Sequence, residues 1–207
     1  MYMGRLLSFS TVFVSGVLGL CPLLAQSNPD TTLTVTATGT IGAVLSGSDP
    51  LGASGESGMV TVMVGESLSP TKTTATSATY TLPPGAITVM VGTIAYTTKT
   101  ASSMKITLPA KGPDVVVLSA NGTVLGIPVS VVVTIDLKHG SFPASVLMHP
   151  ALFRPSSQTL TAATSTTGTG SKIQYTSLGS TTVLGFSGMV SDKAAEDPFL
   201  PEDDSDQ

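Results

Sequence analysis

Residues 115–135 decide the fold and read VVVLSANGTVLGIPVSVVVTI. Two β-branched, apolar runs flank Asn121-Gly122, and both of these residues tolerate the positive φ of a type I′ turn. The stretch therefore predicts a β-hairpin that turns at Asn121-Gly122. The second run, residues 129–135, is nearly all apolar, which is typical of a central strand buried on both faces. A long neutral strand of this kind also invites edge pairing between subunits.

Outside this hairpin, short strands alternate with Gly- and Pro-rich turns. Apolar residues alternate with polar ones in residues 33–38 and 87–91, and this period of two indicates half-buried strands. Threonine is the commonest residue, and β-branched side chains favour strands. A last hairpin is expected around Gly179-Ser180. The sequence predicts an all-β, Ig-like antiparallel β-sandwich of about 9–11 short strands, with two small packed β-domains split near residue 111 as the alternative.

The first 25 residues have the order of a secretory signal peptide. Arg5 precedes an apolar run, and Ala25 provides a small residue for cleavage. We therefore expect a signal peptide at residues 1–25 that is removed on export. A signal that stays uncleaved and anchors the chain in a membrane is the alternative. The single cysteine, Cys21, leaves with a cleaved signal, so no thiol is expected in the mature chain.

The charge of the chain is concentrated near its C-terminal end. The net charge is −4, yet residues 26–191 are almost neutral, whereas residues 192–207 hold seven acidic side chains and one lysine. Like charges without an apolar face predict a disordered acidic tail at residues 192–207. The folded domain is expected over residues 26–191. It has no basic patch that would neutralise phosphates, so nucleic acid is not expected as a partner.

Side chains that could support catalysis are few. The two histidines, His139 and His149, lie in a Pro-rich connection, and the mature chain has no cysteine to complete a zinc site. Serine is plentiful, but the Gly-x-Ser-x-Gly motif that presents a nucleophilic serine is absent. The sequence therefore designates no catalytic residue. The alternative is an enzyme with a site assembled from distant residues, in which His139 or His149 meets Asp136 and a loop serine.

Two Gly-rich loops offer groups that ligands use. Residues 46–58 contain Asp49 and Glu56, which could contact Ca²⁺ or a glycan, although the regular spacing of a calcium-binding loop is missing. Residues 168–172 read GTGSK, but the Walker spacing and the following helix are missing, so a turn is predicted. No residue is designated as cofactor-binding or metal-binding, and no cofactor is expected.

The amino-acid sequence of the mature chain resembles the sequences of a group of exported proteins. Residues 45–52, LSGSDPLG, and residues 78–83, ATYTLP, are similar to Thr/Val/Gly-rich hypothetical exported proteins of acidobacterial type. The resemblance implies a secreted, periplasmic or cell-envelope location, and it transfers no activity and no functional residue.

The scarcity of tunable acids and bases also bears on function, because catalysis usually depends on such groups. The sequence favours a non-catalytic structural or binding/adhesion module of the cell envelope or extracellular space. Its expected partners are other envelope or extracellular proteins or glycans, with membrane contact only through an uncleaved signal. A Ca²⁺- or glycan-binding β-domain that uses residues 46–58, or the enzyme described above, is the alternative.

Overall fold

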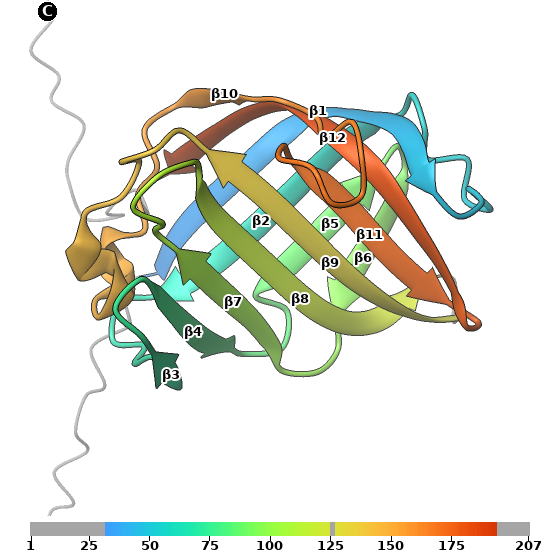
Figure 1. The fold of residues 1–207 in the computed structure, drawn as a ribbon. Helices are drawn as coiled ribbons and strands as arrows, with labels where there is room; N and C mark the ends of the chain where they lie inside the picture. Colours follow the sequence, from blue (N-terminus) through green and yellow to red (C-terminus); the bar gives the residue numbers. More distant parts are fainter. Residues whose placement is uncertain (1–31, 125–126, 194–207) are drawn as a thin grey trace, which may run out of the picture.

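The computed structural model describes residues 32–124 and 127–193, and antiparallel β-strands form most of this part of the chain (Figure 1). The all-β antiparallel, sandwich-like fold predicted from the sequence is confirmed. Two 3₁₀-helical turns, η1 and η2, lie between β9 and β10. The elements are β1 (Thr32–Ser46), β2 (Ser57–Gly65), β3 (Lys72–Thr73), β4 (Ser77–Leu82), β5 (Ile87–Val91), β6 (Ile94–Thr98), β7 (Ser102–Thr107), β8 (Asp114–Val124), β9 (Ile127–Leu137), η1 (Ala144–Leu147), η2 (Pro150–Leu152), β10 (Gln158–Leu160), β11 (Lys172–Ser177) and β12 (Ser180–Lys193).

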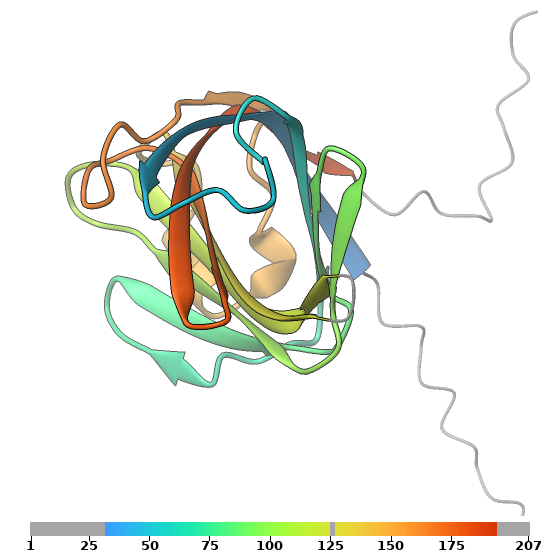
Figure 2. The same cartoon turned by 90° about the vertical axis from the view of Figure 1, so that its right-hand side faces the viewer.

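The strand pairings start at β8 and return to it. They pass from β8 through β9, β11, β12, β1, β2, β5 and β6, and β6 pairs with β8 again at Thr97↔Thr123. Figure 2 looks into this closed arrangement from the end that carries the β11–β12 turn. Strand β7 pairs with another part of β8 and extends the sheet outward through β4 and β3.

Strand alternation builds the core. In β1, Leu33 and Val35 are buried while Thr34 and Thr36 face outward, as the period of two predicts. Buried side chains from before and after residue 111 belong to the same hydrophobic cluster. Opposite walls of the sheet therefore pack across a shared interior, as the layers of a sandwich do.

The connection between β9 and β10 closes one end of this interior. Val146, Leu147, Phe142 and Phe153 are buried in it, and the two phenylalanine rings stack with centroids 5.1 Å apart. The buried Tyr80 hydroxyl donates a 2.7 Å hydrogen bond to the carbonyl oxygen of Val146 in η1. The Pro-rich connection therefore contributes to the core and does not project into solvent as a free loop. No helical segment in the described residues is long and apolar enough to cross a membrane.

The hairpin that decides the fold forms, but its turn lies elsewhere than predicted. Asn121 and Gly122 lie inside β8, where Gly122 pairs with Val129, and the strands meet at Val124↔Ile127. A turn at Asn121-Gly122 would place Leu118 opposite Leu125 and leave residues 130–135 without β8 as a partner. The observed register instead aligns that valine-rich run with β8, so pairing along the whole strand outweighs the local turn preference.

Residues 129–135 were expected to be buried on both faces, and this prediction is wrong. Val131 and Val133 are buried, but Val132 and Thr134 on the other face are partly exposed. The reason is that β9 belongs to one layer around one core, so its outer face meets solvent. Both edges of β9 are occupied, by β8 and by β11, so this strand has no free edge for pairing between subunits.

The predicted C-terminal boundary of the domain also needs a correction. β12 continues to Lys193, and Asp192 pairs with Val35 of β1. The first two residues assigned to the acidic tail therefore belong to the sheet. The predicted signal peptide at residues 1–25 and the rest of the tail at residues 194–207 lie outside the described residues. The hairpin expected around Gly179-Ser180 is confirmed, with Ser177 paired to Ser180.

Candidate functional site

His139, His149 and Asp136 are the residues of the enzyme alternative, and the structure places both histidines apart from Asp136. His139 follows β9, and its Nδ1 lies 3.7 Å from Oδ1 of Asp114, not beside Asp136. Asp136 points away from the core and accepts a 2.6 Å hydrogen bond from the Gly170 backbone N–H. His149 is exposed at the start of η2. The structure therefore brings neither histidine together with Asp136, as the enzyme alternative would require.

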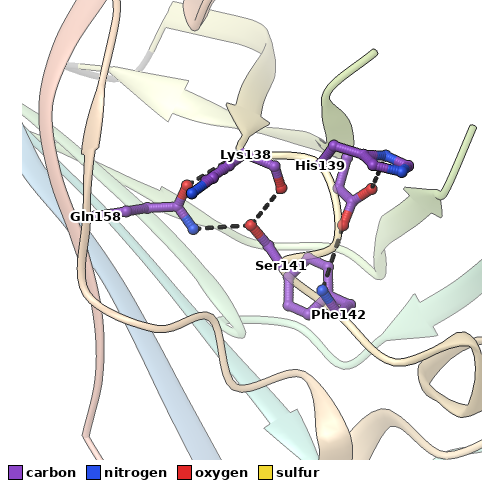
Figure 3. A network of polar contacts seen from close by, with 6 residues as sticks. Lys138, His139, Ser141, Phe142 and Gln158 are labelled. Atoms are coloured by element: carbon purple, nitrogen blue, oxygen red, sulfur yellow. Dashed lines mark hydrogen bonds and ion pairs between the residues drawn. The ribbon is translucent and has the colours of Figure 1, made fainter. Parts of the chain in front are cut away.

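A serine does lie near His139, but its hydrogen bonds point elsewhere (Figure 3). The Ser141 hydroxyl donates to the carbonyl oxygen of Lys138 at 2.5 Å and accepts from Nε2 of Gln158 at 2.9 Å. Oε1 of Gln158 in turn accepts from the Lys138 backbone N–H at 2.8 Å. The hydroxyl proton thus goes to a carbonyl and not to an imidazole, whereas a serine nucleophile needs a base as its acceptor.

Asp114 completes this network from inside the fold. It is 1 % exposed, and its Oδ2 accepts a 3.2 Å hydrogen bond from the Phe142 backbone N–H. Together with the His139 contact, this bond ties the start of β8 to the turn after β9. Buried carboxylates require such partners. We interpret the cluster as a clamp that holds the turn, because its polar groups bind each other.

Residues 46–58 are the loop considered for Ca²⁺ or a glycan, and the Asp49 carboxylate in this loop is hydrogen-bonded within the protein. Oδ2 of Asp49 accepts the Ser54 N–H at 2.8 Å, and Oδ1 accepts the Tyr175 hydroxyl at 2.9 Å. Partial burial alone would raise the pKa of Asp49, but hydrogen bonds from the loop backbone and from Tyr175 outweigh burial and lower the pKa. The Glu56 carboxylate lies beside Gly92 instead. Within the described residues, no three His, Cys, Asp or Glu side chains gather as a metal site.

The GTGSK segment forms a turn stabilised from both ends. Ser171 is fully buried, and its hydroxyl accepts a 3.1 Å hydrogen bond from the Asp136 backbone N–H. Nζ of Lys172 donates to the carbonyl oxygen of Thr166 at 2.6 Å. The predicted turn is confirmed, and the lysine binds its own loop.

A different feature, which the sequence did not reveal, is an apolar pocket at the end of the molecule opposite η1. Three segments meet there: the loop after β1, the ends of β8 and β9, and the β11–β12 turn. The pocket has a volume of about 380 Å³. Its walls include Leu51, Val124, Ile127, Val129, Tyr175 and Leu178.

Leu178 is the most exposed large apolar side chain at this pocket. It is 87 % exposed and occupies a two-residue turn with Gly179, in which φ is 50° for Leu178 and 78° for Gly179. This left-handed backbone suits a type I′ turn, which normally carries Asn-Gly. A leucine at such a position is uncommon. The Leu-Gly pair between two strands is therefore the sequence feature that could have directed attention to this end of the molecule.

A second feature is an uncharged outer surface on β1, β2 and β5. Threonines occupy every outward position of β1 from Thr32 to Thr40. Rows of like side chains cross the strands because the register aligns them. Thr36 pairs with Thr61, which pairs with Thr88, and the next row joins Thr38, Met59 and Met90.

We call this surface the hydroxyl face, defined by the outward residues of β1, β2 and β5. The hydroxyl oxygens of Thr36 and Thr61 lie 3.4 Å apart. Neighbouring strands are about 4.8 Å apart, and alternate residues along a strand are about 6.8 Å apart, so the hydroxyls form a regular array. None of these three strands contains a charged residue.

Comparison of the chain with protein-family models, with curated proteins and with solved structures finds no significant match. The clamp, the pocket and the hydroxyl face are the three features of the described residues that bear on function. Of these, the pocket and the hydroxyl face present groups that the other described residues leave accessible.

Proposed function

We propose that the chain is an exported, non-catalytic binding or adhesion module of the cell envelope or extracellular space, related to exported proteins of acidobacterial type. The observation that carries this proposal is the hydroxyl face. A surface without charge lets a partner approach with little cost of desolvating ions. Its ordered hydroxyls offer donors and acceptors to hydroxyl- or amide-rich partners, such as glycans and extended protein segments.

Methionine supports the same role. Met63 is 41 % exposed on β2, and Met59 and Met90 lie partly exposed in the row beside the threonines. Flexible thioethers adapt to irregular apolar surfaces and recur at binding surfaces. The combination of fixed hydroxyls and adaptable thioethers is suited to contact with a partner, and the clamp around Ser141 gives no comparable support to the enzyme alternative.

Binding to cell envelopes tests the proposal. Purified protein is mixed with isolated envelopes of the exporting cell, and the bound fraction is measured by sedimentation over a range of protein concentrations. We expect saturable binding that Thr36→Glu weakens at least about tenfold, because the new carboxylate must be desolvated at the contact, at a cost of about 1.4 kcal/mol or more.

Thr176→Glu is the matched control. Thr176 is also partly exposed, and its hydroxyl pairs across strands with that of Thr181 at 2.9 Å, but it lies on β11. Equal losses for both variants, or no saturable binding at all, would contradict the proposal. A hydrolytic activity that disappears in His139→Ala would favour the enzyme alternative.

A further inference from the structure

The apolar pocket is independent of the hydroxyl face, since none of its lining residues belongs to the outward positions of β1, β2 or β5. Its volume of about 380 Å³ falls within the range of small-molecule sites. The walls are leucine, isoleucine and valine side chains, with proline, serines and one tyrosine completing the lining. This composition is typical of sites that recognise ligands chiefly by their apolar surface.

The charge around the pocket restricts its ligand. Among the residues that the structure describes, Tyr175 is the only ionisable one that lines it. Burial raises the pKa of Tyr175, and the Asp49 carboxylate beside it raises that pKa further, so the phenol is neutral at physiological pH. Asp49 itself is held by Tyr175 and Ser54. A charged ligand would lose hydration without gaining an opposite charge from the described lining, which is costly.

The pocket wall is supported before any ligand arrives. Thr182 donates a hydrogen bond to the carbonyl oxygen of Ser48, which joins the loop after β1 to β12. The tight β11–β12 turn fixes the backbone of Leu178. A preformed wall reduces the ordering cost of binding.

The chain's own C-terminal segment cannot fill the pocket. β12 runs from Ser180 beside the pocket to Lys193 at the other end, a path of about 40 Å along the strand. Residues 194–200 extend over at most about 25 Å. Phe199 and Leu200, the apolar residues of that segment, are therefore out of reach.

We propose that this pocket binds an uncharged, mostly hydrocarbon small molecule, of the size of a medium-length acyl chain or a pair of fused rings. The ligand lies between Leu178 and Ile127, which is 44 % exposed, and contacts Leu51 and Val129 deeper in the pocket. The serines at the rim bind a hydroxyl or carbonyl group of the ligand. This assignment does not depend on the proposed adhesive function.

Fluorescence of N-phenyl-1-naphthylamine, an uncharged apolar probe, tests the proposal on the purified protein. We expect saturable binding at one site per chain and displacement by decanol. Decanoate, which has the same chain with a negative charge, should displace the probe at least tenfold more weakly. Displacement by decanoate or decylammonium as effective as that by decanol would overturn the assignment to an uncharged ligand.

Leu178→Asn is the decisive variant. Asparagine tolerates the left-handed backbone, so the variant should be at least as stable as the native protein, by up to about 1 kcal/mol. It removes the apolar wall, so probe affinity should fall at least fivefold. Met148→Asn is the control, because Met148 is 55 % exposed but lies beside η1, away from the pocket. Unchanged affinity in folded Leu178→Asn, or an equal loss in Met148→Asn, would refute the site.

Discussion

Three tyrosines of the described chain place their hydroxyls on partners inside the fold. The Tyr96 hydroxyl lies 2.7 Å from the Val129 carbonyl oxygen and 3.1 Å from that of Ala120. Burial raises the pKa of Tyr96 to about 12 and also raises the pKa of Tyr80. The Tyr80 and Tyr96 phenols donate to carbonyl oxygens and the Tyr175 phenol to the Asp49 carboxylate, so the native structure requires their neutral form.

This arrangement predicts a loss of stability at alkaline pH. In the unfolded chain, tyrosine has a pKa of about 10. Below that pH both states keep their protons, and the tyrosine contribution to stability is complete. Between about pH 10 and the raised pKa, the unfolded chain loses protons first, so the free energy of unfolding falls as pH rises. Denaturant unfolding from pH 9 to about pH 12 measures this fall.

Tyr96→Phe provides the control for the alkaline effect. The variant loses a group that titrates differently in the two states, so its free energy of unfolding should depend less steeply on pH above about 10. An ultraviolet absorbance titration of the folded protein should show the described tyrosines ionising above their usual range. Ionisation of Tyr96 near pH 10 in the folded protein would contradict the prediction.

At the scale of single residues, the sequence predicted side-chain alternation but not side-chain partners. Asp136 is close to His139 along the chain, yet strand alternation turns Asp136 outward, and the buried Asp114 of the neighbouring strand β8 lies beside His139. The pocket was missed for a similar reason. Leu51, Ile127 and Leu178 come from three separate segments, and only the closed set of pairings brings them together.

At the scale of the strands, the pairing of β1 with β12 depends on a close contact between two glycines. Gly39 of β1 pairs with Gly188 of β12. A Cβ atom added to Gly39 would lie only 1.8 Å from the carbonyl oxygen of Ser187, and one added to Gly188 would lie 2.0 Å from that of Thr38. No side chain fits there, so the two glycines let the longest strands of the sheet approach each other.

Gly39→Ala should therefore separate β1 from β12. We expect the free energy of unfolding to fall by about 3 kcal/mol or more, because backbone and not a movable side chain blocks the methyl group. Gly42→Ala on the same strand is the control. Its Cβ would lie 3.4 Å from the Gly185 carbonyl oxygen, so the loss should stay below about 1 kcal/mol. Equal effects in denaturant unfolding would refute this explanation.

The elements also show which sequence signals decided the fold. Alternation located β1 and β5, and turn residues located the β11–β12 hairpin, because these signals are local. The β8–β9 register was wrong because Asn121-Gly122 is a strong local turn signal, whereas the pairing of the valine run with β8 depends on many residues at once. Burial summed over a strand outweighs one turn preference.

At the scale of the whole molecule, we expect the sequence that folding needs to end with β12 at Lys193. A chain that ends at Lys193 should keep its melting temperature within about 2 °C, because like charges give residues 194–207 little to pack with. A chain that ends at Ser191 loses the pairs of Asp192 and Lys193 with β1, so it should melt at a lower temperature. A large drop for the longer chain, measured by calorimetry, would show that the acidic segment packs.

The pairing of β1 with β12 joins the first and last strands of the described chain. β1 therefore lacks one neighbour until the ribosome has made nearly the whole protein. Contacts between such distant residues form slowly, since a long loop must close first. We therefore expect the sheet to stay open during synthesis. If the protein is exported as we propose, this delay leaves the chain unfolded while it passes through a narrow translocation channel. The strands would then close the sheet on the far side of the membrane.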